Sequence, residues 1–314
     1  IMKIVFLDAK TIGEDIDLSG FDVLGEVVKY GFSTAEEARE RSKDADVLIL
    51  NKVQVNQQTI GEADHLKLVC VTATGTNNLD KEYLDKRGIA WRNVAGYSTE
   101  SVAQHTFAML FYLLEKLPYY DNYVKSEKYV NDVSFTHFAK AFHELSGMTY
   151  GIIGLGNIGR RVADIAKAFG CRVIYYSTSG RNSQPGYERV SFDELLEQSD
   201  IVSIHAPLDE NTLGLMNKEA FAKMKKSAIL LNVGRGPIIN EADLAEALNN
   251  KTIAAAGLDV LSVEPMQEDN PLRGIKDSER LLITPHIAWA GVEARNRLMG
   301  IILGQIKEFF KAHE

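Results

Sequence analysis

The feature that most constrains the fold is a glycine-rich turn between a predicted strand and a predicted helix. Gly154, Gly156 and Gly159 have the spacing GxGxxG, after the apolar run 150–153 and at the start of the amphipathic stretch 158–169. In such a turn the first glycine allows the tight bend, the second lets a pyrophosphate approach the backbone, and the third lets the helix pack closely on the strand. The pattern therefore predicts a dinucleotide-binding βαβ unit.

The residues around this turn also bear on the choice of dinucleotide. Asn157 and Ile158 open the predicted helix, whose N-terminus attracts phosphates. A second strand predicted at 172–176 is followed by Ser177, where a carboxylate would bind the ribose of NAD and repel a 2′-phosphate. Arg181 can pair with a phosphate through two hydrogen bonds. We therefore expect NAD(P) binding, with NADP or dual use favoured; the alternative is that Arg181 points to solvent and Ser177 binds the ribose of NAD.

Strand-like and amphipathic stretches alternate along the whole chain. This alternation predicts an α/β protein with two doubly wound, Rossmann-like domains built on parallel sheets. The stretch 291–314 predicts one final helix with no strand after it, so we expect that helix to pack back on the first domain. The dinucleotide-binding domain, 99–286, is then inserted into a split catalytic domain of 1–98 and 287–314. The strands predicted for the inserted domain are 150–153, 172–176, 201–205, 228–232, 253–258 and 281–284.

Two further segments of the chain are rich in apolar residues: 99–146 and the final helix. A long helix is predicted from Thr99 to Pro118, followed by an irregular segment, 119–146, that is rich in tyrosine and phenylalanine. This much apolar surface predicts a subunit interface, and hence a homodimer. The final helix is expected to bury a face made of Ile301, Ile302, Ile306 and Phe309.

Charge and cysteine usage exclude several classes of function. The net charge of −8, from 35 basic and 43 acidic side chains, opposes binding to a nucleic-acid backbone. Cys70 and Cys171 lie in apolar runs, which is typical of small buried side chains in a reducing compartment, so we expect a cytoplasmic protein. The run 107–114 is too short for a membrane span, and 1–7 lacks the pattern of a signal peptide. No spacing of His, Cys and carboxylate residues predicts a metal site.

Three polar residues follow predicted strands at the edge where doubly wound sheets bind ligands. Arg235 can fork to a carboxylate and a carbonyl, and the imidazole of His286 belongs to a side-chain type that can give or take a proton. Glu264 can hydrogen-bond the imidazole and stabilise its charged form. Each alone has an ordinary explanation as a surface, loop or turn residue. Together they could supply an anchor for an anionic group and a proton donor beside a nicotinamide cofactor.

Several separated motifs, covering nearly the whole chain, resemble those of the D-isomer-specific 2-hydroxyacid dehydrogenases. The motifs are Asn78-Leu79-Asp80, Ser101-Val102-Ala103-Gln104-His105, the glycine turn, His205-Ala206-Pro207-Leu208, Asn232-Val233-Gly234-Arg235-Gly236, Gly257-Leu258-Asp259-Val260 and Thr284-Pro285-His286-Ile287-Ala288-Trp289. The resemblance implies an NAD(P)-dependent oxidoreductase whose catalytic residues are Arg235, Glu264 and His286.

The resemblance also implies the residues that contact cofactor and substrate. Asp259 would accept a hydrogen bond from the nicotinamide carboxamide, unless it only caps a neighbouring loop. Further cofactor contacts are implied at Thr74, Ala206, Pro207, Thr212, Val233, Gly234 and Ala288. Substrate contacts are implied at Ala73, Thr74, Gly75, Arg235, His286 and Trp289. His105 and His205 are expected to be structural. Val71, Asn77 and Gln104 depart from the family's common residues and leave the substrate open.

The branch of the family suggests a small substrate. Trp289 and the aromatic residues 119–123 most resemble the hydroxypyruvate reductase, or glycerate dehydrogenase, branch. A bulky indole beside the site favours hydroxypyruvate or glyoxylate. D-lactate-type or branched 2-hydroxy acids are the alternative substrates. A rival of another class is a nucleotide-sensing binding protein like the family's corepressors.

Overall fold

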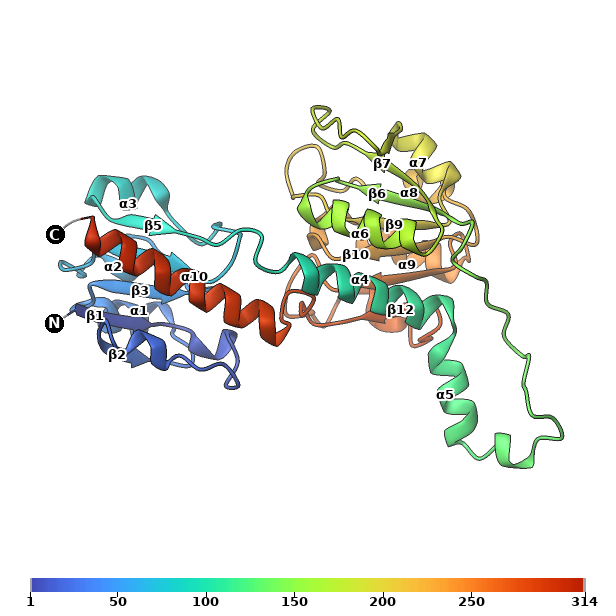
Figure 1. Cartoon of the computed structure of the whole chain (residues 1–314), viewed down its shortest axis with the longest axis horizontal. Helices are drawn as coiled ribbons and strands as arrows, with labels where there is room; N and C mark the ends of the chain where they lie inside the picture. Colours follow the sequence, from blue (N-terminus) through green and yellow to red (C-terminus); the bar gives the residue numbers. More distant parts are fainter. Residues whose placement is uncertain (1, 313–314) are drawn as a thin grey trace. The chain divides into compact units, whose positions relative to one another are not determined.

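The computed structural model describes residues 2–312, which form two compact α/β units (Figure 1). Unit 1 joins Ile1–Ser98 to Ala290–Glu314, and unit 2 is Thr99–Trp289. The chain therefore passes between the units twice, and unit 2 is an insertion in unit 1. None of the described helices is both long and apolar enough to cross a membrane.

Unit 1 contains a five-stranded sheet, parallel throughout, in the order β2-β1-β3-β4-β5. Its strands are β1 (Met2–Phe6), β2 (Gly25–Lys29), β3 (Val47–Leu50), β4 (Leu68–Val71) and β5 (Ala90–Arg92). Every residue of β3 and β4 is buried, as in strands covered on both faces. The two edge strands, β2 and β5, are only partly buried and mixed in polarity, and the sequence did not predict them.

The described residues of unit 1 form four α-helices: α1 (Ala35–Ser42), α2 (Gln57–Ile60), α3 (Lys81–Arg87) and α10 (Val292–Lys311). In α10 the buried side chains include Leu298, Ile302 and Ile306, which are spaced four residues apart. Ile301 was expected on the same face, but it is 37% exposed. A helix turns by about 100° at each residue, so the neighbour of a buried residue points away from the core.

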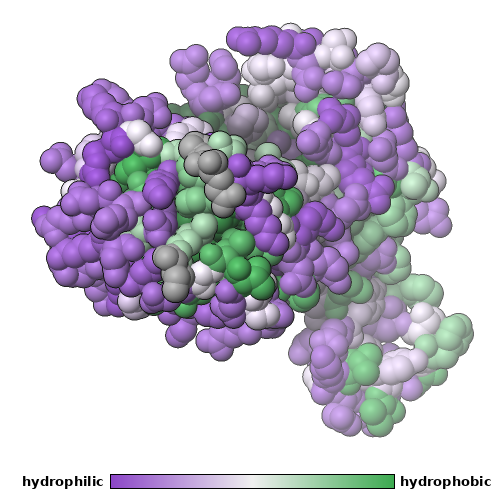
Figure 2. Space-filling view, turned by 60° about the vertical axis from the view of Figure 1, so that its left-hand side comes forward, coloured by the Kyte–Doolittle hydropathy of each residue, from purple (hydrophilic) through white to green (hydrophobic). Residues whose placement is uncertain are grey.

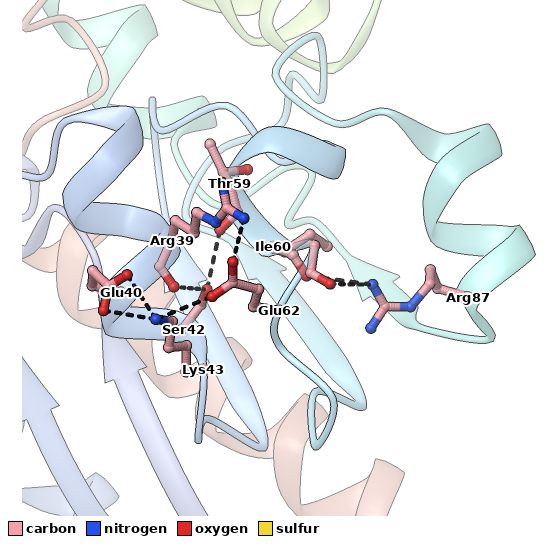
Figure 3. Close-up of polar contacts among 9 residues, drawn as sticks. Arg39, Glu40, Ser42, Lys43, Thr59, Ile60, Glu62 and Arg87 are labelled. Carbon is pink, nitrogen blue, oxygen red and sulfur yellow. Dashed lines mark hydrogen bonds and ion pairs between the residues drawn. The ribbon is translucent and has the colours of Figure 1, made fainter.

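Polar contacts connect α1 with the segment around α2 (Figure 3). Arg39 of α1 and Lys43, the residue directly after α1, both form ion pairs with Glu62. Beneath them the buried hydroxyl of Ser42 donates to the carbonyl of Thr59, at 3.1 Å. The ion pairs are exposed and contribute at most about 1 kcal/mol each, so the buried contact and the apolar core do most to hold these helices together.

Unit 2 contains a seven-stranded parallel sheet in the order β12-β11-β10-β9-β6-β7-β8, which confirms the predicted doubly wound class. The strands are β6 (Thr149–Ile153), β7 (Arg172–Tyr176), β8 (Glu188–Arg189), β9 (Ile201–Ile204), β10 (Ile229–Asn232), β11 (Ala255–Leu258) and β12 (Leu281–Ile283). The strand order reverses between β6 and β9. This switch point is where doubly wound sheets bind ligands.

Helices cover both faces of this sheet (Figure 1). They are α4 (Thr99–Leu114), α6 (Asn157–Ala168), α7 (Phe192–Gln198), α8 (Lys218–Lys223) and α9 (Glu241–Asn249). One core cluster joins α4 and α6 to the sheet, and Phe107 stacks there on Tyr150 with ring centroids 5.8 Å apart. The other cluster joins α7, α8 and α9 to the opposite face. The strand ends between these layers are therefore held firmly.

The segment after α4 differs from the prediction. Helix α4 ends at Leu114, and Pro118 lies in the first turn of α5 (Leu117–Lys125) instead of ending the longer helix. Proline is accepted in a first turn because the N–H that it lacks would have no partner there. The aromatic segment thus begins as a helix, and we call residues 117–142 the arm. Figure 1 shows the arm extending away from the sheet of unit 2.

Candidate active site

The glycine turn connects β6 to α6 at the switch point of the unit 2 sheet. Gly154 has a φ of +90°, and a Cβ there would lie 2.8 Å from the backbone of the buried Ala206, in the loop after β9. A Cβ on Gly159 would lie 2.3 Å from the carbonyl oxygen of Gly154. Gly156 has no described atom within 4 Å of such a Cβ, so open space faces it. Gly154 thus provides the bend, Gly156 leaves the backbone open to a ligand, and Gly159 allows α6 to pack closely on the turn.

The N-terminus of α6 is free to face an anion. No described side chain caps α6 at Gly156, whereas Ser191 and Glu194 form a capping box at the start of α7. The first N–H groups of α6, including those of Asn157 and Ile158, carry the positive end of the helix dipole. These features fit the pyrophosphate of a dinucleotide.

The loop after β7 carries the residues expected to select between NAD and NADP. Ser177 is buried, and its hydroxyl accepts a hydrogen bond from the N–H of Asn182, at 3.2 Å. Arg181 is exposed between them. The guanidinium of Arg189, in β8, donates to the carbonyls of Gly180 and Asn182, at 3.0 and 3.3 Å. The sequence analysis missed Arg189 because its strand has only two residues and no apolar pattern.

The loop after β9 is held together from inside. The hydroxyl of Thr212 donates to the carbonyl of Pro207, at 2.7 Å, and accepts from the N–H of Asp209, at 2.9 Å. Thr212 is fully buried. Its hydroxyl is therefore engaged within the loop, and its contribution to a cofactor site would be to shape the backbone around Pro207.

His205 is the first residue of this loop, and it is a partly buried, neutral group. Its Nε2 contacts the hydroxyl of Ser203, and its Nδ1 is buried with no hydrogen-bond partner among the described residues. Burial lowers the pKa of His205 to about 3. A histidine in this condition cannot exchange protons near neutral pH, which agrees with the structural role expected from the sequence.

The loop after β10 is organised by an asparagine that the sequence analysis did not single out. The buried side chain of Asn232 donates to the carbonyl of Arg235 and accepts from the N–H of Gly234, both at 3.0 Å. The Arg235 side chain is exposed. A Cβ on Gly236 would lie 1.9 Å from the backbone of Leu261, so this loop packs directly on the loop after β11. The Arg235 and Glu264 loops are therefore neighbours.

Glu264 and His286 are brought together as expected. One carboxylate oxygen of Glu264 accepts from the N–H of Leu261, at 2.9 Å, and the other lies 2.7 Å from Nδ1 of His286. An ionised carboxylate only accepts hydrogen bonds, so Nδ1 carries the hydrogen. Nε2 is then the nitrogen that exchanges a proton with a ligand. The two side chains are 34% and 31% exposed, which leaves the pair accessible.

The backbone at His286 is strained. Its φ is +55°, and its N–H donates to the carbonyls of Asp259 and Thr284, at 2.8 and 2.9 Å. The indole of Trp289 donates to the carbonyl of His286, at 2.8 Å. A conformation of this kind costs about 1–3 kcal/mol in a residue other than glycine, and it persists only where neighbours enforce it. The contacts on both sides of His286 provide that enforcement.

Asp259 has its carboxylate engaged in the loop of His286. This buried side chain accepts hydrogen bonds from the hydroxyl of Thr284 and the N–H groups of Ile287 and Ala288, at 2.6–2.9 Å. The capping role that the sequence left open is thus present, and the contact with nicotinamide stays a prediction. Val233, half-buried after β10, is likewise a predicted contact.

The remaining predicted residues belong to unit 1. Ala73, Thr74 and Gly75 follow β4 at the carboxyl edge of that sheet. The hydroxyl of Thr74 donates to the carbonyl of Val94, at 2.9 Å, and the amide of Asn93 donates to the carbonyl of Thr74, at 2.6 Å. These contacts give the loop a defined shape. Its part in binding substrate and cofactor stays a prediction.

The fold and the chemistry of unit 2 point to one class of protein. A glycine turn at the switch point of a doubly wound sheet is suited to a dinucleotide, and a histidine paired with a carboxylate at the same edge can move a proton. Nicotinamide-dependent oxidoreductases combine these properties. Residues 107–288 match the family model for the NAD binding domain of D-isomer specific 2-hydroxyacid dehydrogenases. The chain belongs to this family, which confirms the resemblance found in its motifs.

Similar proteins support the assignment over the full chain. The hydroxypyruvate reductase of Blautia hydrogenotrophica is 39% identical over 99% of this chain and 97% of its own length. The glycerate dehydrogenase of Methylorubrum extorquens is 33% identical over 98% and 96%. The crystal structure of an NADPH-dependent glyoxylate/hydroxypyruvate reductase from Sinorhizobium meliloti has a TM-score of 0.83, with 25% identity over 99% of this chain and 95% of that one.

Proposed function

We propose that this protein reduces hydroxypyruvate or glyoxylate to the corresponding 2-hydroxy acid with a nicotinamide dinucleotide. The observation that carries the proposal is the Glu264–His286 pair, which leaves Nε2 of His286 as the proton donor, in a site where the loop of Glu264 packs on the loop of Arg235. The names of the two relatives at 39% and 33% identity support the same substrate class.

The residues of the site divide the reaction between them. When bound, the dinucleotide supplies a hydride to the carbonyl carbon of the substrate. Arg235 holds the carboxylate and polarises the carbonyl oxygen. His286 gives the proton on Nε2 to that oxygen, so the carbonyl gains one hydride and one proton. Glu264 keeps the hydrogen on Nδ1 and stabilises the imidazolium that donates. In the oxidation direction His286 takes the proton back.

A panel assay tests this function. NADPH and NADH consumption is measured with hydroxypyruvate, glyoxylate, pyruvate and branched 2-keto acids, and we expect the first two to give the highest kcat/KM. Arg235→Ala should lower kcat/KM by about a hundredfold or more, because hydrogen bonds to charged groups contribute about 1.5–3 kcal/mol each, while dinucleotide binding is retained. Binding of the dinucleotide without turnover of any keto acid would favour the nucleotide-sensing role instead.

We propose further that NADPH is used at least as well as NADH. The loop of residues 177–182 has no carboxylate, and the exposed Arg181 can reach a 2′-phosphate while Arg189 holds the loop. Arg181→Ala should raise KM for NADPH by about tenfold and leave KM for NADH unchanged. Ser177→Asp should shift the preference to NADH, since the new carboxylate opposes the phosphate. A hundredfold preference of the wild type for NADH would contradict the proposal.

We also propose that two copies of the chain associate through the arm. Val130, Val133, Phe135 and Phe138 are 74–103% exposed, and apolar groups lie among the polar ones over the arm in the space-filling view (Figure 2). Surfaces of this kind mark interfaces. Sedimentation at micromolar concentration should show a dimer. The double variant Phe135→Ser, Phe138→Ser should be a monomer, and Phe32→Ser, an exposed aromatic of unit 1, serves as the control. A monomeric wild type would refute the interface.

A further inference from the structure

Helix α4 contacts the loop that carries His286 at two points, one before and one after the histidine. His105 lies 2.9 Å, through Nε2, from the hydroxyl of Thr284, two residues before His286. Ser101, one turn earlier on the same face of α4, donates to the carbonyl of Ala288, two residues after His286, at 2.7 Å. We propose that His105 is a positioning residue that holds His286 in its proton-donating orientation through Thr284, an inference that rests on the proposed function of His286.

The direction of the hydrogen bonds shows how His105 acts. Thr284 has one hydroxyl hydrogen, and it points to the carboxylate of Asp259, 2.6 Å away. An ionised carboxylate cannot donate, so Thr284 must accept from His105, and Nε2 of His105 carries a hydrogen. His105 therefore fixes the rotamer of Thr284 that bonds Asp259. Its Nε2 also lies 3.5 Å from the same carboxylate oxygen.

Asp259 passes this constraint to both sides of His286. Its carboxylate holds Thr284 before the histidine and the N–H groups of Ile287 and Ala288 after it. Its carbonyl accepts the N–H of His286 itself, at 2.8 Å. One buried residue, Asp259, thus contacts the chain before, at and after His286. His105 in turn sets the position of Thr284, which bonds Asp259.

The alternative is that His105 only fills space between α4 and the loop. Its side chain is 20% exposed, so an aromatic ring of similar size fits the same volume. If packing were its whole contribution, phenylalanine would replace it without effect on the reaction. If the hydrogen bond matters, phenylalanine fails and glutamine, whose amide N–H can reach the place of Nε2, succeeds.

The experiment compares His105→Phe, His105→Gln and Thr284→Val in the full chain. We expect His105→Phe and Thr284→Val to lower kcat by about tenfold to a hundredfold, since small displacements of catalytic groups have effects of this size. KM for the keto acid and the Kd of NADPH should stay within about threefold, because neither residue is among the predicted contacts with substrate or cofactor. His105→Gln should retain most of the wild-type kcat. Thr106→Val, the next residue of α4, removes a buried hydroxyl that bonds only its own helix, and should leave kcat unchanged.

A second measurement separates this inference from the proposed function. If the wild type reduces no keto acid, the proposed function fails, and the inference is then tested by NMR of the His286 imidazole in the NADPH complex. The Nδ1–H proton bonded to Glu264 should be resolved in the wild type and in His105→Gln, and lost or broadened in His105→Phe. Wild-type kcat in His105→Phe, equal losses in both His105 variants, or an unchanged imidazole proton would each overturn the inference.

Discussion

The loops that follow β9 and β12 belong to the same edge of the unit 2 sheet, and each carries a histidine close to the strand end. The imidazole of His205 contacts the hydroxyl of Ser203 through Nε2, and its Nδ1 is buried with no hydrogen-bond partner among the described residues. His286 is partly exposed, strained in its backbone and paired with the carboxylate of Glu264. The two histidines therefore have similar positions in the fold, and they differ in the partner of Nδ1.

This difference shows what makes a histidine useful for catalysis. A hydroxyl partner and burial keep the imidazole of His205 neutral, so it contributes packing and one hydrogen bond. A carboxylate partner orders the ring of His286, and the partial exposure of the side chain leaves the pair accessible. Four measurements can break or sharpen the contrast.

The largest expected effect is that of removing the proton donor. His286→Asn should lower kcat by about 10²–10⁴-fold, the range typical of a general acid. Asparagine tolerates a positive φ, so the loop is retained. The matched variant is His205→Gln, whose amide can replace the contact with Ser203, and its kcat should stay near the wild-type value. Equal losses of kcat in the two variants would remove the distinction between the loops.

A smaller loss is expected when only the charge of the partner is removed. Glu264→Gln keeps an acceptor for Nδ1 of His286, but a charge-assisted hydrogen bond is about twice as strong as a neutral one. We expect kcat to fall by about tenfold, which corresponds to about 1.4 kcal/mol. Glu241→Gln is the control, because Glu241 accepts from the N–H of Ser262 in the same loop. Full activity of Glu264→Gln would show that the charge is dispensable.

The third measurement concerns stability at acid pH. Burial holds the pKa of His205 at about 3, so below the ordinary value near 6.5 the unfolded chain binds a proton that the folded chain does not. Stability is therefore lost as pH falls from 6.5 towards 3. Between pH 7 and pH 5 the free energy of unfolding of the wild type should drop by about 2 kcal/mol more than that of His205→Gln. Parallel urea titrations at both pH values provide the comparison, and identical drops would mean that His205 is protonated in the folded state.

The smallest effect is expected in the loop after β9. Thr212→Val removes the hydroxyl that bonds Pro207 and Asp209, and should lower the free energy of unfolding by about 1 kcal/mol. KM for NADPH should not change. A rise in KM for NADPH with unchanged stability would instead make Thr212 a direct cofactor contact, as the resemblance of the chain to its family implies.

Local sequence patterns predicted the parts of the molecule that depend on neighbouring residues. The glycine spacing predicted the turn at Gly154, and apolar runs predicted the buried strands, because both depend on a few adjacent positions. Pro118 misled the prediction, since a proline that ends one helix and a proline that begins the next look alike without the tertiary contacts. The two-residue β8 has no pattern to find.

The supporting contacts of the site could not be predicted in the same way. Asn232, Thr284 and Arg189 act through hydrogen bonds to backbone groups whose positions only the folded loops define. A polar residue at the last position of a buried strand, such as Asn232, is the one signal that the sequence offered. The left-handed backbone at His286 had none, because a histidine does not indicate its own φ.

The hydrogen bond from Ser101 to the carbonyl of Ala288 has a consequence for the modularity of the protein. It joins the first turn of unit 2 to its last loop, so the segment that begins at Thr99 and ends at Trp289 starts and finishes at one place. A segment whose two ends lie close together can be expressed as a separate domain. Its ends can also be joined by a short linker to make a circular permutant. We expect a gene fragment for residues 99–289 to yield an autonomous dinucleotide-binding module, ready for transplantation between relatives.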